Sequence, residues 1–241
     1  MGPLALPTGL AFLPTGFASL DKALGIGGLP RGRIVEIFGP ASCGKTALAL
    51  QIVANLQRHE GAAAWIDADH SFDAGFAAEL GVEVSRLPVA APDSTEAAGE
   101  MARRLTASGV LDLVVIDSAA ALTPQVELDS DLGIAAGGLY SRALGSVLRR
   151  LAATAARCEV CVLVINQTRI RPDREGQTET SAGGPPLKLY AAARIQLAAN
   201  GRRVKFRIVK NTFGAAFSTG ILEWHPAGSG SGAGPGFVEP L

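Results

Sequence analysis

Residues 33–50 read Arg33-Ile-Val-Glu-Ile-Phe-Gly-Pro-Ala-Ser-Cys-Gly-Lys-Thr-Ala-Leu-Ala-Leu50. The first six residues are mostly β-branched or aromatic, which is typical of a buried strand. Gly39 to Thr46 follow with the spacing G-x-x-x-x-G-K-T, and an alanine- and leucine-rich helical pattern begins directly after them. The sequence therefore predicts a strand, a glycine-rich loop and a helix in immediate succession.

This loop has the composition of a phosphate-binding site. Two of its glycines allow backbone angles that a β-carbon disfavours, so successive N–H groups can turn inward around a phosphate. Lys45 can reach the β- and γ-phosphate oxygens, Thr46 can offer its hydroxyl to Mg²⁺, and the helix N-terminus favours an anion. A glycine-rich turn without a ligand is the structural alternative. We expect a nucleoside triphosphate site formed by Gly39, Pro40, Ala41, Ser42, Cys43, Gly44, Lys45, Thr46 and Ala47.

Composition limits the class of protein. The 241 residues support one large domain, or a domain with a small appendage, and 48% of them are hydrophobic, enough for a sheet covered on both faces. The net charge is zero, so contact with nucleic acid requires a local basic patch. Three cysteines are too few for a disulfide scaffold. Without a signal-peptide pattern or an apolar run of roughly 18 residues, we expect a cytoplasmic protein that does not enter a membrane.

Predicted strands and helices alternate along the chain. Strands are expected at 33–38, 62–67, 87–90, 111–117 and 160–166, and helices at 16–24, 46–58, 72–80, 94–108 and 138–157. This alternation predicts an α/β fold with a mostly parallel sheet flanked by helices, which strands at 193–197, 203–209 and 217–223 extend. We expect an N-terminal arm (1–14), a nucleotide-binding core (15–225) and a flexible glycine- and serine-rich tail (226–241).

Polar residues end several predicted strands, where ligands of parallel sheets gather. Asp117 ends one apolar strand and can hold Mg²⁺ together with the loop threonine; a turn cap is the alternative. Asp67 and Asp69 follow the second strand, which we expect close to the first. Asp69 can orient or deprotonate water, although it could instead cap the next helix. Gln167 can sense the γ-phosphate or act as a structural amide. Asp69, Gln167 and Lys45 are the candidate catalytic residues.

Cys43 lies within the loop, near the predicted N-terminus of the first long helix. A thiol in that position can have a lowered pKa, which would make it sensitive to oxidation. The alternative is that Cys43 replaces a serine for steric reasons only.

Together these motifs resemble the RecA recombinase family. The resemblance runs from about residue 15 to residue 223, and its motifs are residues 28–46, Trp65-Ile-Asp-Ala-Asp-His70, Val115-Ile-Asp-Ser-Ala-Ala-Ala-Leu-Thr-Pro124, Val164-Ile-Asn-Gln167, Leu187-Lys-Leu-Tyr190 and Val209-Lys-Asn211. It implies an ATP- and Mg²⁺-binding core, with Asp73 and Phe76 at the nucleotide and Phe76 against the adenine. It also implies that residues 128–138 and 169–184 form two loops that touch single-stranded DNA. The implied DNA-binding residues are Arg142, Arg149, Arg169, Arg171, Gly183 and Gly184.

Several positions depart from that family. Asp69 stands where the family has a catalytic glutamate, and the loss of one methylene withdraws the carboxylate by roughly 1 Å, which can cost on the order of 10²-fold in rate. Two family lysines close over the neighbouring subunit's ATP; the first is Lys210 here, but the second is Thr212. Leu189 replaces an aromatic residue that relays the ATP state between subunits. Residues 169–184 carry no net charge, so we expect single-stranded DNA binding to be weak or lost.

Three functional hypotheses follow from the resemblance. The first is a shortened RecA-like accessory of DNA repair in the SOS response, similar to the ImuA-type proteins, with slow ATP hydrolysis. Its expected partners are ATP or ADP, RecA and components of a translesion polymerase. We expect the protein to lack the family's N-terminal docking segment and its C-terminal DNA-gathering domain, and this expectation favours the first hypothesis. The alternative is an active DNA-dependent ATPase recombinase that forms filaments on single-stranded DNA. The third is a structural partner whose nucleotide only holds the fold.

Overall fold

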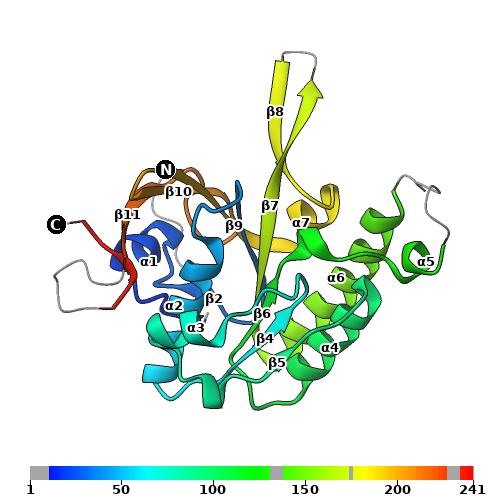
Figure 1. Ribbon diagram of the computed structural model, residues 1–241, viewed down its shortest axis with the longest axis horizontal. Helices are drawn as coiled ribbons and strands as arrows, with labels where there is room; N and C mark the ends of the chain where they lie inside the picture. Colours follow the sequence, from blue (N-terminus) through cyan, green and yellow to red (C-terminus); the bar gives the residue numbers. More distant parts are fainter. Residues whose placement is uncertain (1–10, 131–137, 174–175, 227–233, 241) are drawn as a thin grey trace.

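A computed structural model describes residues 11–130, 138–173, 176–226 and 234–240, and side chains at 170–179 lie outside its description. Within these ranges, one sheet crosses the molecule in the order β12-β11-β10-β9-β3-β7-β6-β4-β5 (Figure 1). The strands are β3 (Ile34–Gly39), β4 (Ala63–Asp67), β5 (Val89–Ala90), β6 (Leu113–Asp117), β7 (Cys161–Asp173), β9 (Ala191–Asn200), β10 (Arg203–Asn211), β11 (Thr219–His225) and β12 (Gly236–Val238). From β9 to β5 all neighbours pair in parallel, whereas β10, β11 and β12 join antiparallel.

Helices cover both faces of the parallel part. On one face, α2 (Lys45–Arg58) packs against the sheet; on the other, α4 (Thr95–Ala107) and α6 (Leu139–Cys158) lie side by side (Figure 1). Alternation along β3 explains why both faces need cover, because Val35 and Ile37 join one buried cluster and Ile34 joins the other. The predicted α/β fold with a mostly parallel, helix-flanked sheet is confirmed.

The three long predicted helices are correct to within one residue at each end. Ser94 caps α4, since its Oγ accepts a hydrogen bond from the Ala97 N–H at 3.2 Å. The shorter helices are α1 (Ala18–Leu24), α3 (Ala74–Glu79), α5 (Gln125–Leu128) and α7 (Pro185–Tyr190). None of the helices in the described ranges is long and apolar enough to cross a membrane.

One expectation about strand order is wrong. The second predicted strand, β4, does not lie beside β3, because β7 and β6 stand between them. Hydrophobic patterns identify each strand but carry no information about which strands pair. The functional consequence is small, since parallel strands end at one edge, and Asp67 of β4 is directly aligned with Asp117 of β6.

The sequence predicts a loop for the whole polar segment 169–184. The structure shows that much of this segment is a hairpin of two strands. Strand β7 continues to Asp173 and pairs antiparallel with β8 (Gly176–Ser181), with Thr168 opposite Ser181 and Asp173 opposite Gly176. This hairpin projects from the body of the molecule (Figure 1). Threonine and isoleucine recur along it and favour extended backbone, although its charged residues suggested a loop. Residues 174–175, and residues 131–137 of the first predicted DNA loop, lie outside the described ranges.

Both ends of the chain carry short strands. Within the predicted arm, β1 (Phe12–Leu13) pairs with β2 (Leu29–Pro30). At the other end, β12 pairs antiparallel with β11, which overturns the expectation of a flexible tail for residues 236–238. The reason is burial of one aromatic side chain, since Phe237 is 4% exposed. The surrounding glycine- and serine-rich composition concealed this anchor from sequence reasoning.

Candidate nucleotide-binding site

The loop between β3 and α2 has a backbone that specific glycines permit. A β-carbon on Gly39 would lie 2.5 Å from the Leu197 carbonyl oxygen, closer than such atoms approach. Gly44 has φ of +88°, and a β-carbon there would lie 2.4 Å from the Phe237 ring. Only glycine fits these positions without displacing a neighbour. Close packing against Leu197 and Phe237 therefore explains the two glycines of the phosphate-loop pattern.

Lys45, the first residue of α2, turns its ammonium into this loop. Its Nζ donates to the carbonyl oxygens of Gly39 at 3.2 Å and Pro40 at 2.6 Å, and only 8% of the residue is exposed. The cation thus stands at the N-terminal end of a fourteen-residue helix. Both the charge and the helix dipole favour an anion at this point.

Cys43 does not have the lowered pKa that its position suggested. Its thiol is buried, and burial raises its pKa, although the nearby Lys45 charge acts in the opposite direction. A protonated thiol is a poor nucleophile and resists oxidation. The steric explanation, a small residue in a tight loop, fits the geometry better than a redox role.

Thr46 and Asp117 provide oxygen ligands suited to Mg²⁺. The Thr46 hydroxyl donates to Asp117 Oδ2 at 2.7 Å. Burial raises the pKa of the Asp117 carboxyl to about 6. The hydrogen bond from Thr46 lowers this pKa, whereas the negative charges of Asp69 and Asp67 raise it further. A magnesium ion needs one or two such protein ligands, and nucleotide phosphates complete its shell. The donor set therefore fits a magnesium–nucleotide complex.

The three aspartates after β4 have different local roles. Asp67 is buried and accepts the N–H groups of Ser71 at 3.1 Å and Phe72 at 3.0 Å, so it shapes the turn. Asp73 caps α3 by accepting the Phe76 N–H at 3.0 Å. Asp69 is exposed, accepts the Ser71 hydroxyl at 2.7 Å and lies close enough to raise the pKa of Asp117. The alternative of helix capping thus belongs to Asp73, and the role of Asp69 in catalysis stays a prediction.

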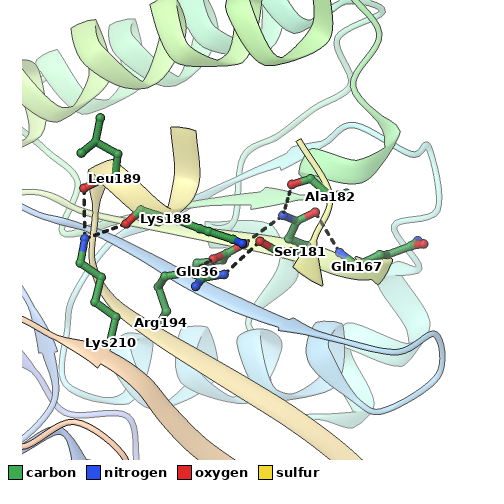
Figure 2. A network of polar contacts seen from close by, with 9 residues as sticks. Glu36, Gln167, Ser181, Ala182, Lys188, Leu189, Arg194 and Lys210 are labelled. Atoms are coloured by element: carbon green, nitrogen blue, oxygen red, sulfur yellow. Dashed lines mark hydrogen bonds and ion pairs between the residues drawn. The ribbon is translucent and has the colours of Figure 1, made fainter. Parts of the chain in front are cut away.

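Gln167 lies beside the start of the phosphate loop. It is directly aligned with Gly39 across the parallel pair β3–β7, and its side chain is exposed. Its backbone N–H donates to Asn166 Oδ1 at 2.9 Å (Figure 2). Gln167 therefore lies at the end of the β3–β7 pairing where the phosphate loop begins, and its role as a γ-phosphate sensor stays a prediction.

A buried polar network, which sequence reasoning missed, joins β3 to the base of the hairpin (Figure 2). Glu36 is fully buried, pairs with Arg194 of β9 and accepts Asn166 Nδ2 at 2.9 Å. Asn166 Nδ2 also donates to the Ala182 carbonyl at 3.0 Å, and Arg194 Nη2 donates to Ser181 Oγ at 3.0 Å. The available signal was a glutamate inside an otherwise apolar strand. The network connects the strand leading into the loop with the residues that leave the hairpin.

The arginines predicted to contact DNA lie on α6 and at the hairpin. Arg142 and Arg149 are exposed and seven residues apart, which places them on one face of the helix. Arg149 Nε donates to the Tyr190 hydroxyl at 3.2 Å. Arg169 is exposed at the base of the hairpin, and its charge acts on the partly buried Tyr140 of α6, whose pKa is raised by desolvation. The side chain of Arg171 lies outside the described part of the chain.

Gly183 and Gly184, also predicted to contact DNA, have a packing reason for being glycine. Their φ values are +82° and +74°. A β-carbon on Gly183 would lie 2.7 Å from Leu144 Cδ2, and one on Gly184 would lie 3.3 Å from Ser141 Oγ. Close approach to α6 therefore explains both residues, and their contact with DNA stays a prediction.

A cavity of about 350 Å³ adjoins the phosphate loop. Loop residues 42–47 line it together with the aromatic side chains of Phe76, Trp224 and Phe237. Phe76 is therefore part of the cavity lining, and its contact with the adenine stays a prediction. Trp224 and Phe237 were not among the expected residues, because they come from the two last strands of the sheet.

Comparison with known proteins agrees with this geometry. Residues 7–224 match the family described as the RecA N-terminal domain. The chain is 44% identical to "Protein RecA" of Chlamydia felis over 222 residues, 87% of this chain and 63% of the relative. It is 44% identical to that of Treponema pallidum, over 87% of this chain and 54% of the relative, and 43% identical to that of Geobacter sulfurreducens, over 88% and 66%. The chain thus spans about half to two thirds of the length of these relatives.

Proposed function

This chain belongs to the RecA family, and from that membership we propose that it is an ATP-binding DNA-repair protein that works as an accessory to other repair proteins. The observation that carries the proposal is the convergence of Lys45, Thr46 and Asp117 at one glycine-rich loop. Bound ATP and Mg²⁺ would supply the triphosphate and the charge that neutralises it. The loop N–H groups and Lys45 would bind the phosphates, and Thr46 and Asp117 would hold the metal.

Hydrolysis in this site would be slow. The charge of Asp69 acts on the Asp117 carboxyl, and this supports Asp69 as the group that would orient water or accept its proton. It is shorter by one methylene than the glutamate of the resembled family, and a withdrawal of roughly 1 Å can cost on the order of 10²-fold in rate. Gln167, beside Gly39, would report the γ-phosphate to the hairpin.

Contact with single-stranded DNA would be weak in this proposal. Arg142 of α6 and Arg169 at the hairpin base are both exposed, which supports phosphate contact along α6 and the hairpin base. Residues 169–184 nevertheless carry as many acidic as basic side chains. Because affinity for phosphate rises with the positive charge that neutralises it, a neutral segment gains little. A repair accessory in the SOS response, acting on RecA or a translesion polymerase, would need no stronger binding to single-stranded DNA.

Nucleotide binding is tested with Lys45→Ala. We expect calorimetry with magnesium ATP to show binding by the wild type and none by the variant, because the only loop ammonium is removed. Lys205→Ala is the matched control, since Lys205 is exposed on β10 outside the loop. Unchanged ATP affinity in Lys45→Ala would refute the site assignment.

The accessory role is tested by assembly. Electron microscopy of the protein with ATP and single-stranded DNA should show no long helical filaments. A pull-down should retain RecA or translesion polymerase from the same cells, and a Lys45→Ala bait should retain less if ATP shapes the contact surface. Long filaments would instead favour the alternative, an active DNA-dependent recombinase.

A further inference from the structure

One edge of the sheet is only partly covered. Strand β11 has β10 on one side, but on its other side β12 pairs only with its last three residues, 223–225. Residues 219–222 therefore have no strand on that side within the described ranges. This open stretch lies at the rim of the sheet, next to the C-terminal segment (Figure 1). An uncovered strand edge is a template for pairing with another extended chain.

The hydrogen bonds of β11 show which of its backbone groups are open. Trp224 donates its N–H to the Arg202 carbonyl at 2.7 Å, so the even-numbered residues of β11 bond to β10. Because the bonding side alternates along an antiparallel ladder, Thr219 and Ile221 point their N–H and C=O groups away from β10. In the part of the chain that the structure describes, these groups have no protein partner.

The segment after β12 explains why the stretch stays open. Gln51 of α2 covers the outer side of β12, because its Oε1 accepts the Phe237 N–H at 2.7 Å and its Nε2 donates to the Phe237 carbonyl at 3.2 Å. One residue after the strand, Glu239 turns away and accepts a backbone N–H in the first turn of α1. Continued in register, Pro240 would stand opposite Ile221, and proline has no N–H to donate.

A cavity of about 610 Å³ lies along the open stretch. Thr219, Gly220 and Ile221 line it together with Lys205 of β10 and the residues that follow β12. Gly220 has no side chain that could shield the edge, and a β-carbon there would lie 2.2 Å from the Phe206 ring. Ile221 is 41% exposed. The cavity therefore presents open backbone groups and an apolar side chain together.

The outer face of the sheet beside this edge is basic. Three basic residues of β10 alternate on it: Arg203, Lys205 and Arg207. Arg203 pairs with Glu223 of β11 at 2.8 Å, whereas Lys205 and Arg207 form no ion pair within the described ranges. Lys205 lies directly opposite Ile221, one strand in from the open edge. Positive charge that no acidic residue offsets thus adjoins the open stretch, which favours an acidic partner.

We propose that β11 receives an extended, acidic segment of a partner protein as an added antiparallel strand. Thr219 and Ile221 would each exchange two backbone hydrogen bonds with this segment. An apolar side chain of the segment would pack on Ile221, and an acidic side chain two residues away, on the same face, would lie within reach of Lys205. This cavity shares no lining residue with the nucleotide cavity, so the proposal does not depend on the ATP site.

The first test uses the full chain without nucleotide and three labelled synthetic peptides. One peptide repeats the sequence Val-Thr-Asp-Thr, which puts valine and aspartate on one face of a strand and threonine on the other. The second has lysine in place of aspartate, and the third is the first with an N-methylated backbone that cannot pair. Fluorescence anisotropy should show binding of the first peptide and much weaker binding of the other two. Equal binding of all three, or binding of none, would overturn the proposal.

Variants locate the contact on β11. Thr219→Pro should weaken binding of the aspartate peptide at least about tenfold, because it removes an N–H from the open side and leaves the bonds to β10 in place. Thr219→Val is the matched control, since it keeps the N–H and the preference for extended backbone. Lys205→Glu should weaken the aspartate peptide and strengthen the lysine peptide, each by about fivefold. Equal binding by Thr219→Pro and Thr219→Val would exclude strand addition at this edge.

Amide exchange followed by NMR gives a readout on the wild-type chain. The aspartate peptide should slow exchange at Thr219 and Ile221, whose N–H groups are open. The amides of Gly220 and Leu222 face β10 and should change little. Exchange that the peptide leaves unaltered at Thr219 and Ile221 would contradict pairing with this strand.

Other occupants of the edge give different results. Dimers of the wild type that Thr219→Pro abolishes would assign the edge to a second copy of this chain. Displacement of the aspartate peptide by single-stranded DNA, with equal DNA binding by Thr219→Pro and Thr219→Val, would assign the basic face to nucleic acid. Either result would overturn the proposal, and neither would affect the ATP site, which Lys45→Ala tests separately.

Discussion

At the scale of single residues, the proposed slow hydrolysis depends on Asp69. We predict that Asp69→Glu raises the rate of ATP hydrolysis by on the order of 10²-fold, because the added methylene carries the carboxylate roughly 1 Å further toward the nucleotide. Phosphate release at saturating magnesium ATP measures this. Asp69→Asn is the control and should be slower than wild type, since an amide accepts no proton. A glutamate variant no faster than wild type would exclude Asp69 as the misplaced base.

Asp117 gives the protein a specific dependence on pH. Burial raises the pKa of its carboxyl from 3.8 to about 6, so the folded state holds a proton that the unfolded state has released. The resulting stabilisation is complete below pH 3.8 and is lost as the pH rises through about 6, in total about 3 kcal/mol. We predict that Asp117→Asn, which never ionises, is more stable than wild type at pH 7.5, and that the difference diminishes toward pH 4.5.

Urea denaturation across that pH range, with a chelator present, measures this difference. Asp93→Asn provides the control, since the Asp93 side chain is 93% exposed and its loss removes no buried charge. Parallel pH profiles for wild type and Asp117→Asn would contradict the role assigned to burial.

At the scale of elements, the exit of the hairpin depends on close packing against α6. We predict that Gly183→Ala destabilises the protein by about 2–4 kcal/mol, because the residue has positive φ and its β-carbon would meet Leu144. Gly109→Ala is the matched control, since Gly109 has φ of +77° and open space around it, and only the backbone cost of about 1–2 kcal/mol applies. Urea denaturation of both variants gives the comparison. Equal losses would mean that packing against α6 adds nothing.

The network of Figure 2 fixes β3 against β9 and the hairpin base. We predict that Arg194→Met costs about 3–5 kcal/mol of unfolding free energy, because Glu36 stays buried without its partner. Adding Glu36→Gln should recover part of this loss. Arg203→Met, which breaks the exposed pair with Glu223, should cost at most about 1 kcal/mol. Denaturant titration of the four proteins tests the prediction, and similar losses for the two single arginine variants would refute it.

The sequence reveals an element or a site residue when the interactions that form it join residues that are close in sequence. Helices α2, α4 and α6, the phosphate loop and Asp117 depend on neighbours in sequence, so periodicity and spacing identify them. The extension of β7 into a hairpin, and the anchoring of β12, depend on pairing partners that no local pattern names. Trp224 and Phe237 meet only because β11 and β12 pair in one register. The contribution of Trp224 and Phe237 to the lining of the cavity beside the phosphate loop was therefore not predictable from the sequence.

At the scale of the whole molecule, charge sets the strength of any contact with DNA. The chain has 22 basic and 22 acidic residues, so no overall field attracts a polyanion. Arg142 and Arg169 are exposed at the edge where the parallel strands end, together with the phosphate loop. Binding of DNA through this edge would therefore place it near the nucleotide, whereas a uniformly basic surface would give no such relation.

We predict that replacing Arg142 and Arg169 by alanine weakens binding to single-stranded DNA and reduces the slope of log affinity against log salt by about 1.4, since each phosphate contact contributes about 0.7. Fluorescence anisotropy with a labelled oligonucleotide, at several salt concentrations, measures both quantities. Arg58 and Arg104 provide a control double variant of equal charge, because they are exposed near the C-terminal ends of α2 and α4, at the opposite edge of the sheet. Their replacement should leave the slope unchanged. If both double variants lower the slope equally, the contact is a diffuse attraction and the hairpin edge is not a DNA site.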